Sequence, residues 1–167
     1  IGFTHKWFDL IMTCVNTVRY SVKLNGTILD SFAPSRGLRQ GDPLSPYLFL
    51  FVADGLSALF DSATRLGNVS PVKICRSAPG ISHLLFADNT LLFFEAKQSQ
   101  AMHVKSILNA YTAATGQLLN PAKCSILFGE YCPIIQQHEV RAMLQADTIN
   151  FEESYLGLPT PDGRMTK

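Results

Sequence analysis

The sequence has few charged residues and no strong excess of either sign. Lysine, arginine, aspartate and glutamate together make up 16% of the 167 residues, and the formal net charge at pH 7 is +1. A strongly basic total is the usual mark of a nucleic-acid-binding domain, and this chain lacks it. If the chain binds nucleic acid, the binding must come from local groups.

The sequence also lacks the cysteine pairs of a zinc site and the long apolar run of a membrane helix. No two cysteines form a C-x-x-C pair and no secretory signal opens the chain, so we expect buried free thiols in a reducing, intracellular compartment. The nearest apolar run, residues 47–53, is much shorter than the roughly 18 residues of a membrane helix, so we expect no membrane segment. The cysteines are Cys14, Cys75, Cys124 and Cys132.

Apolar content, by contrast, is high. Hydrophobic residues make up 47% of the chain, and this length is enough for one globular domain with a sizeable core. The sequence begins at Ile1 rather than at a methionine and ends at Lys167 without a terminating pattern. We therefore expect residues 1–167 to form one partial domain of a longer protein.

The first half of the chain predicts a helix, a hairpin and a second helix. Apolar residues at helical spacing indicate the first helix, with Thr4 as its N-cap. Asn25-Gly26 is a strong hairpin signal. Ser45 followed by Pro46 is typical of a helix start, and the helix that follows is apolar nearly all round, so it should be buried on several sides. The expected elements are a helix at His5–Thr17, strands at Arg19–Leu24 and Thr27–Phe32, a loop at Ala33–Asp42 and a helix from Pro46 to about Phe60.

The second half alternates helices with short strands. Ser99 is a suitable N-cap for a helix to Thr115, which Gly116 would stop. Long helices alternating with hairpins indicate an α+β architecture, with helices on one face of a largely antiparallel sheet. The other expected elements are strands at Val72–Cys75 and Cys124–Phe128, a helix at Ile134–Leu144, and a short strand or turn at Tyr155–Leu158.

The stretch from His83 to Glu95 organises the rest of the chain. Its apolar arms on both sides of Asp88-Asn89 predict a β-hairpin whose strands are covered on both faces. Asp and Asn tolerate the backbone angles of a tight turn, so a turn alone explains the pair. A carboxylate at the tip of a rigid hairpin is also well placed to hold a hard cation. Asp54, inside the apolar helix, is explained more simply as a partly exposed or paired carboxylate.

Two motifs in a fixed order connect this hairpin with a known family. The loop RGLRQGDPLSP at residues 36–46 is followed by FADN at residues 86–89. Both motifs in this order, with residues 116–125 and 155–159 after them, closely resemble the reverse transcriptase domain of plant LINE-type (non-LTR) retrotransposons. The resemblance covers essentially the whole chain. It implies a polymerase palm-like antiparallel sheet with helices packed on one face, together with part of the fingers.

The resemblance implies a role for the matched residues. In this family two Mg²⁺ ions activate the primer hydroxyl and stabilise the departing pyrophosphate, and Asp88 matches a metal-binding aspartate of the family's hairpin. The family usually has a second aspartate at the position of Asn89. The loop from Gly37 to Gly41, with Gln40, corresponds to the segment that shapes the nascent base pair, where glycines let the backbone approach closely. The implied partners are an RNA template, a DNA primer and deoxynucleotides.

Other matched residues have two interpretations each. Arg36 and Arg39 fit a phosphate-binding role and a structural salt bridge equally well. Lys123 lies where the family often has a lysine that steadies the pyrophosphate, but a lysine just ahead of a strand is more often only solvated. A segment near the end of the chain resembles the family's turn that supports the primer end. Apolar packing explains the residues of this segment equally well. The residues of that turn are Tyr155, Leu156 and Gly157.

The resemblance also indicates what the chain lacks. The family's other catalytic aspartate lies on a strand upstream of Ile1, and Asp9, among helical apolar residues, is not its substitute. An amide oxygen at Asn89 can coordinate Mg²⁺ but brings no charge to offset the cation. We therefore expect an RNA-directed DNA polymerase domain by descent that does not itself polymerise DNA. The alternative is a non-catalytic module that keeps the palm fold to bind nucleic acid or protein.

Without the upstream strand, a sheet edge or an apolar face should be exposed. Such surfaces associate with one another, so we expect the isolated chain to aggregate. The resemblance is compatible with a nuclear location.

Overall fold

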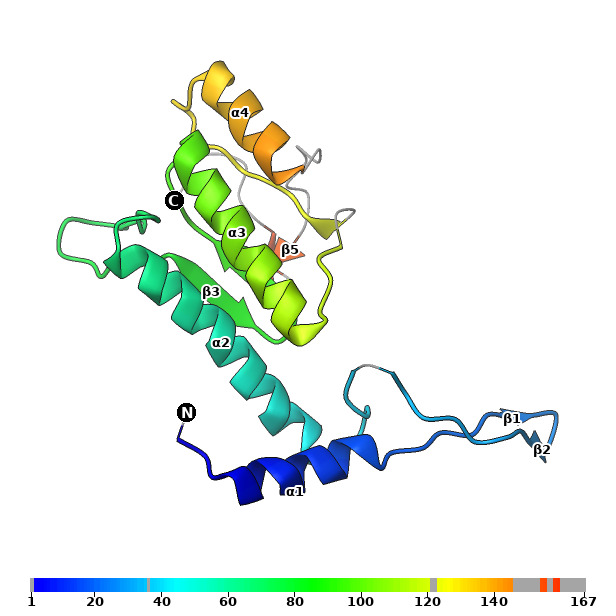
Figure 1. Cartoon of the computed structure of the whole chain (residues 1–167). Helices are drawn as coiled ribbons and strands as arrows, with labels where there is room; N and C mark the ends of the chain where they lie inside the picture. The colour runs from blue at the N-terminus through cyan, green and yellow to red at the C-terminus, as the bar shows by residue number, and fades with distance from the viewer. Residues whose placement is uncertain (1, 36, 121–122, 146–153, 156–157, 160–167) are drawn as a thin grey trace. The chain divides into compact units, whose positions relative to one another are not determined.

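The computed structural model describes residues 2–35, 37–120, 123–145, 154–155 and 158–159 (Figure 1). These residues form an α+β fold of four helices and short antiparallel strand pairs. The chain divides into two units, residues 1–51 and residues 52–167, which are described separately. The elements are α1 (His5–Asn16), β1 (Lys23–Leu24), β2 (Thr27–Ile28), α2 (Ser45–Arg65), β3 (His83–Phe86), β4 (Asn89–Leu92), α3 (Gln98–Thr115), α4 (Ile134–Leu144), β5 (Ser154–Tyr155) and β6 (Leu158–Pro159).

Helix α1 begins where the sequence predicts. The N–H of Trp7 donates to the hydroxyl of Thr4 at 3.3 Å, which confirms Thr4 as the N-cap. The rings of Phe3 and Trp7 stack with their centroids 3.8 Å apart, and Phe51 meets the two rings edge-on at 5.4 and 6.1 Å. These three aromatic rings fasten the start of α1 to the last residue of the first unit.

The β1–β2 hairpin turns at Asn25 and Gly26, as predicted. Both residues have positive φ angles, +48° and +85°, which the favoured two-residue hairpin turn requires. The predicted strands are longer than the observed ones, because the register shifts by one residue before the next bridge, between Tyr20 and Phe32. A shift of this kind is a β-bulge, and it ends the regular ladder. The paired residues are Lys23 with Ile28 and Leu24 with Thr27.

The start of helix α2 differs from the prediction. The carboxylate of Asp42 accepts a hydrogen bond from the N–H of Leu44 at 2.8 Å, and its carbonyl accepts from the N–H of Ser45. Asp42 therefore caps the turn at residues 42–45 that leads into α2, with Pro43 next to it in the position that proline favours. Ser45 is not the cap, because its hydroxyl donates to the carbonyl of Arg39 at 2.8 Å.

The expectation that α2 is buried on several sides is wrong for the described residues. Tyr47 and Leu50 are 65% and 62% exposed, and Asp54 is exposed, as expected. In the first unit the described neighbours of α2 are α1 and the preceding loop, which cover only part of its surface. An apolar pattern shows that a helix has faces suited to packing, but it does not show how many neighbouring elements cover those faces. The buried residues of α2 are Leu56, Phe60 and Ala63.

By length and composition alone, α2 is also the one helix of the described residues that could cross a membrane. The core helix of a globular protein passes the same test, so no membrane segment is assigned.

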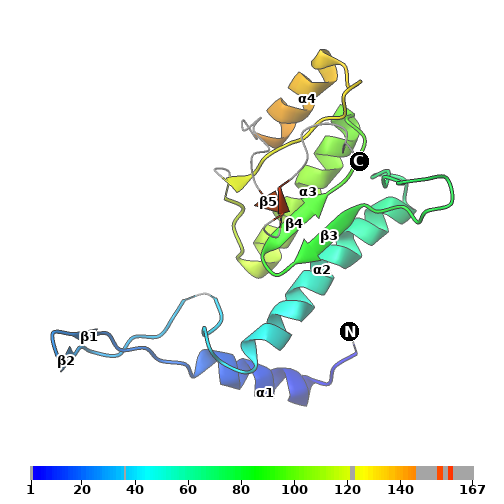
Figure 2. The ribbon, with the colours of Figure 1, turned by 180° about the vertical axis from the view of Figure 1, so that it is seen from behind.

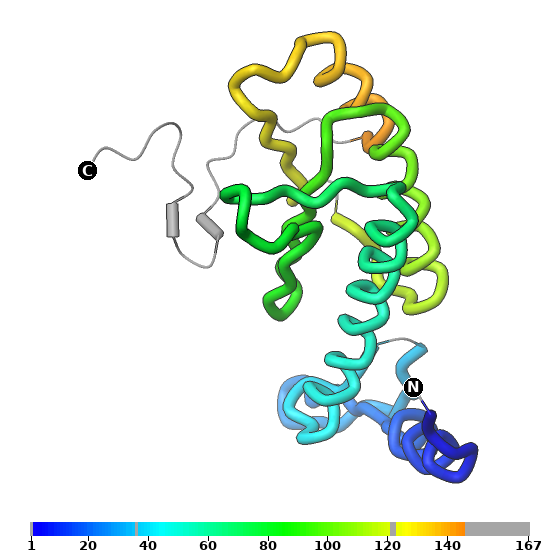
Figure 3. The backbone as a smooth tube through the Cα atoms, turned by 90° about the vertical axis from the view of Figure 1, so that its left-hand side faces the viewer, coloured from blue at the N-terminus to red at the C-terminus, as the bar shows by residue number. Residues whose placement is uncertain are grey.

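The second unit is built around the β3–β4 hairpin. Its core joins the second half of α2, the following turn and α3, against one face of the hairpin (Figures 1 and 2). Figure 3 shows the hairpin on one side of these helices. The core residues are Leu56, Phe60, Ala63, Val69 and Val104, with Leu85, Leu92, Phe94, Ile107, Leu108, Tyr111 and Leu144 packed against them.

Among the described residues nothing covers the other face of the hairpin, which corrects the prediction of strands buried on both sides. Leu84 and Phe86 point to this open face and are 43% and 57% exposed. The alternation of half-buried and exposed residues along β3 is typical of a strand with one face on the core. In the described residues the strands form three separate two-stranded ladders and no single continuous sheet.

Helices α3 and α4 pack on each other, and Lys105 of α3 donates to the carbonyl of Met143 at 2.8 Å. Gly116 ends α3 with a φ of +71°, as predicted. The helix starts one residue ahead of Ser99, however, and its N-cap position is Lys97. Ser99 therefore lies inside the first turn and does not cap the helix.

Two predicted strands are reduced to single bridges in the structure. In Val72–Cys75 only Val72 pairs, with Ile81, and the chain then turns. In Cys124–Phe128 only Ser125 makes a bridge, and the ring of Phe128 lies under the guanidinium of Arg141 at 5.2 Å. Neither apolar segment therefore has a long strand partner among the described residues.

The cysteines are less buried than expected. Cys14 and Cys75 are exposed, and Cys124 and Cys132 are half-buried. None of the four belongs to the core cluster of the second unit.

Candidate functional site

The tip of the β3–β4 hairpin presents Asp88. Phe86 pairs with Asn89, so the two turn residues are Ala87 and Asp88. The sequence predicted that Asp88 and Asn89 would form the turn, and this is wrong by one residue. Ala87 takes the left-handed backbone conformation, with a φ of +50°. A residue with a side chain rarely adopts it, which marks this turn as strained.

The turn separates the surroundings of Asp88 and Asn89. Asp88 is exposed at the tip, whereas Asn89 is the first residue of β4 and shares the open apolar face with Phe86. Within the described residues, no group of three or more His, Cys, Asp or Glu side chains could hold a metal ion. Asp88 therefore belongs to no cluster of three or more such side chains, and the described donor set alone does not make a complete divalent-metal site.

Lys123, the third predicted catalytic residue, is exposed in a short helical turn. Its N–H donates to the carbonyl of Asn120 at 3.0 Å. Among the described residues no ion pair joins Lys123 to Asp88.

At the base of the hairpin, two serine hydroxyl groups form hydrogen bonds with the ring of His83. Nε2 of His83 lies 2.5 Å from the hydroxyl of Ser57 on α2, and Nδ1 lies 2.9 Å from the hydroxyl of Ser82. The ring also packs on Phe60, with the centroids 5.6 Å apart. Both ring nitrogens are therefore partnered, which fixes the orientation of His83 between helix and strand.

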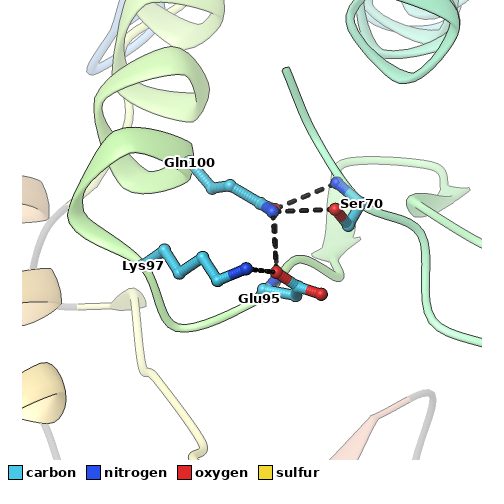
Figure 4. A network of polar contacts seen from close by, with 4 residues as sticks. All are labelled: Ser70, Glu95, Lys97 and Gln100. Atoms are coloured by element: carbon cyan, nitrogen blue, oxygen red, sulfur yellow. Dashed lines mark hydrogen bonds and ion pairs between the residues drawn. The ribbon is translucent and has the colours of Figure 1, made fainter. Parts of the chain in front are cut away.

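The buried side chain of Gln100 holds the segment that follows β4 (Figure 4). The amide oxygen of Gln100 accepts from the backbone N–H groups of Ser70 and Glu95, at 3.0 and 3.1 Å. Its amide nitrogen donates to the hydroxyl of Ser70 and to the carboxylate of Glu95, which also pairs with Lys97. Gln100 is only 6% exposed, so these bonds satisfy a side chain that water does not reach. The network joins the start of α3 to the end of the hairpin.

In the first unit the predicted nucleotide and template loop is built on two glycines. Gly37 and Gly41 have φ angles of +82° and +81°, and a Cβ atom at either position would meet nothing within 4 Å. The backbone conformation, and not a shortage of space, thus favours glycine here. Arg39 and Gln40 lie between the glycines with exposed side chains.

This loop borders a small hollow of the first unit. The hollow is open to solvent and mixes apolar groups of α1 with polar groups of the loop and of the start of α2. Its lining residues are Cys14, Val15, Val18, Tyr20, Pro34, Gly37, Leu38, Arg39, Asp42, Leu44, Ser45 and Leu48.

Some predicted site residues lie outside the described part of the chain. They are Arg36, Leu156 and Gly157. Tyr155 is in β5 and pairs with Leu158 of β6, which agrees with a short strand in this segment.

The sequence interpretation missed several residues that position the site. Asp42-Pro43 carries the same cap signature as Ser45-Pro46 and could have been found. Ala87, His83 and Gln100 carry no local signal, because their roles depend on strand register and on contacts between distant segments.

Comparison with known proteins gives the class of this chain. It matches the family described as reverse transcriptase (RNA-dependent DNA polymerase) over residues 2–158, and it belongs to that family. Members of the family generally bind a nucleic-acid template and primer and use divalent metal ions.

Relatives place the chain near the Pol proteins of non-LTR retrotransposons. It is 32% identical over 117 residues to the retrovirus-related Pol polyprotein of the type-1 retrotransposable element R2 of Popillia japonica, which covers 70% of this chain and 18% of that protein. It is 33% identical over 106 residues to the corresponding R2DM polyprotein of Drosophila melanogaster, covering 62% of this chain and 9% of that protein.

A third relative is an uncharacterized mitochondrial protein of Arabidopsis thaliana, 48% identical over 67 residues, which covers 40% of this chain and 55% of that protein. The chain thus spans less than one fifth of either R2 polyprotein and about half of the Arabidopsis protein. No solved structure matches it.

Proposed function

We propose that residues 1–167 form a partial reverse transcriptase domain, with a palm-like core and part of the fingers, and that this chain does not extend a primer. The observation that carries the proposal is the hairpin turn that presents Asp88 alone, with Asn89 on the neighbouring apolar face. Family membership supports the reaction class, RNA-directed DNA polymerisation. The geometry supports its loss in this chain.

The proposed metal role belongs to Asp88. In a two-metal nucleotidyl transferase, Mg²⁺ ions neutralise the charge that develops on the attacking and leaving oxygens. Asp88 would hold such an ion through its carboxylate, but the described residues contain no cluster of three or more His, Cys, Asp or Glu side chains to complete the site. The amide of Asn89 supplies no negative charge, so both metal affinity and charge stabilisation should fall.

The nucleic-acid contacts are proposed for the loop of the first unit. The exposed side chains of Arg39 and Gln40, between two backbone positions that favour glycine, are suited to contact a nucleotide or template strand. Arg36 belongs to the same motif and is proposed to share this role. The proposed ligands are an RNA template, a DNA primer and deoxynucleotides.

Two further roles follow from the family motifs. Lys123, exposed in its turn, is proposed to steady the pyrophosphate charge. Tyr155, Leu156 and Gly157 are proposed to support the primer end, and the pairing of Tyr155 with Leu158 supports a turn in this segment.

Primer extension tests the proposal. The purified chain, given an RNA template, a labelled DNA primer, deoxynucleotides and Mg²⁺, should yield no extended product. Asn89→Asp alone should also yield none. Extension by the unmodified chain would contradict the proposed inactivity.

A fusion tests the two defects separately. The chain is joined to the segment that precedes the matching region in the Popillia japonica R2 polyprotein, with and without Asn89→Asp. We expect extension only in the fusion that carries Asn89→Asp, and we expect Asp88→Asn to abolish it. Equal activity in the fusion that keeps Asn89 would show that the amide is sufficient.

A further inference from the structure

The loop between α2 and β3, residues 71–81, is a cationic projection of the second unit. It extends beyond the end of α2 (Figures 1 and 2). Lys73 and Arg76 are both exposed, and the sequence has no acidic residue between Asp61 and Asp88. Among the described residues neither cation has an ion-pair partner. Two unpaired positive charges therefore face solvent on one short loop.

The neck of this loop is fixed by backbone contacts. The N–H of Val72 donates to the carbonyl of Ile81 at 2.9 Å, and the N–H of Ile81 donates back at 2.8 Å. Beside this pair, a Cβ atom on Gly80 would come within 2.7 Å of the ring of Pro71, so the two chain segments are in close contact. The cations thus project from a closed neck rather than from a long open linker.

The tip of the loop is turned by local hydrogen bonds. The N–H of Ala78 donates to the carbonyl of Cys75 at 3.1 Å, and the thiol of Cys75 lies 3.4 Å from the hydroxyl of Ser77. Ile74, between the two cations, is 85% exposed. The tip therefore offers an apolar side chain flanked by positive charges, which suits a ligand with a charged backbone and flat apolar groups.

We propose that this loop binds the phosphate backbone of single-stranded RNA through Lys73 and Arg76, at a place separate from the hairpin tip. The loop joins β3 at the end opposite Asp88, and the chain from Ile81 to Asp88, seven residues further on, spans at most roughly 23 Å. A strand held here would be a continuation of nucleic acid several nucleotides away from Asp88. The site depends on the proposed function only for the class of its ligand, not for polymerisation.

Binding of a fluorescein-labelled 20-nucleotide oligouridylate to the purified chain tests the proposal. The double variant Lys73→Gln, Arg76→Gln should bind about tenfold or more weakly near 0.1 M salt, and the slope of log K against log salt should fall by about 1.4, for two lost phosphate contacts. Lys73→Arg with Arg76→Lys keeps both charges and should bind like the unmodified chain.

A matched control separates the loop from total charge. Lys6 and Arg19 are exposed cations of the first unit, so Lys6→Gln with Arg19→Gln removes the same charge elsewhere. Equal weakening by both double variants would overturn the proposal. Far-ultraviolet circular dichroism should be the same for all variants, because the substituted side chains are exposed.

Two further outcomes distinguish RNA binding from lipid binding, and this RNA site from the proposed loss of polymerisation. If the loop variant binds RNA normally but loses binding to phosphatidylserine vesicles, the loop contacts a lipid surface and the proposal is wrong. Primer extension by the unmodified chain would contradict the proposed inactivity while leaving this RNA site intact, so the two failures are separable.

Discussion

The hydroxyl of Ser57 on α2 and Nε2 of His83 on β3 form a short hydrogen bond of 2.5 Å across the second unit. This bond connects a helix to a strand that lies 26 residues further along the chain. Because it is part-buried, its loss leaves a ring nitrogen with little access to water.

Removing this hydroxyl should destabilise the fold. Ser57→Ala should lower the free energy of unfolding by about 1–2 kcal/mol, measured by urea denaturation. Ser99→Ala is the control, because Ser99 is exposed and does not cap α3, so its change should stay within about 0.5 kcal/mol. A loss of similar size at Ser99 would show that Ser99 has a capping role after all.

Gln100 should matter more than its neighbours on α3. Gln100→Leu leaves the backbone N–H groups of Ser70 and Glu95 without their acceptor and should cost about 2–4 kcal/mol. Hydrogen exchange at these two amides should become faster than at amides elsewhere in the unit. Gln98→Leu, at an exposed position two residues earlier on α3, should leave both amides protected.

Two glycine substitutions should have opposite signs. Gly41→Ala places a side chain at a φ of +81° and should destabilise the chain by about 1–2 kcal/mol. Gly55→Ala lies inside α2, where a Cβ would meet nothing within 4 Å, and should stabilise it by about 0.5–1 kcal/mol. Thermal unfolding of the two variants measures the difference. Two changes of the same sign would contradict the backbone assignment of Gly41.

The thiol of Cys75 should ionise at unusually low pH. The Ser77 hydroxyl, followed by backbone N–H groups of Ser77 and Ala78, holds the pKa of Cys75 below its ordinary value. Hydrogen bonds to the thiolate favour the charged form, so alkylation by iodoacetamide should begin at a lower pH than for an ordinary cysteine. Ser77→Ala should move the alkylation profile of Cys75 to higher pH, as followed by mass spectrometry of its peptide. An unchanged profile would show that the hydroxyl is not responsible.

Local signals in the sequence were sufficient for several elements. The Asn25-Gly26 turn, the Thr4 cap and the Gly116 stop depend on backbone preferences of one or two residues, and the structure confirms all three. The family was also predictable, because the two motifs around Gln40 and Asp88 are local stretches in a fixed order.

Features that depend on distant partners were not predictable. Leu84, Phe86 and part of α2 are exposed because few described elements pack against them. The periodicity of apolar residues does not predict the number of packing neighbours. The hairpin turn was misplaced by one residue because Ala87 has a low preference for positive φ, and only the register of the paired strands places it there.

The backbone of Ala87 has a consequence for how the hairpin tip responds to the interior. A left-handed conformation at a residue with a side chain costs about 1–2 kcal/mol and persists only where surrounding structure holds it. Here the two strands are held by Leu85 and Leu92, which pack on the core. Because these core contacts hold Ala87 in its left-handed conformation, we expect a change at Leu85 or Leu92 to relax the turn and to alter the direction of the Asp88 carboxylate.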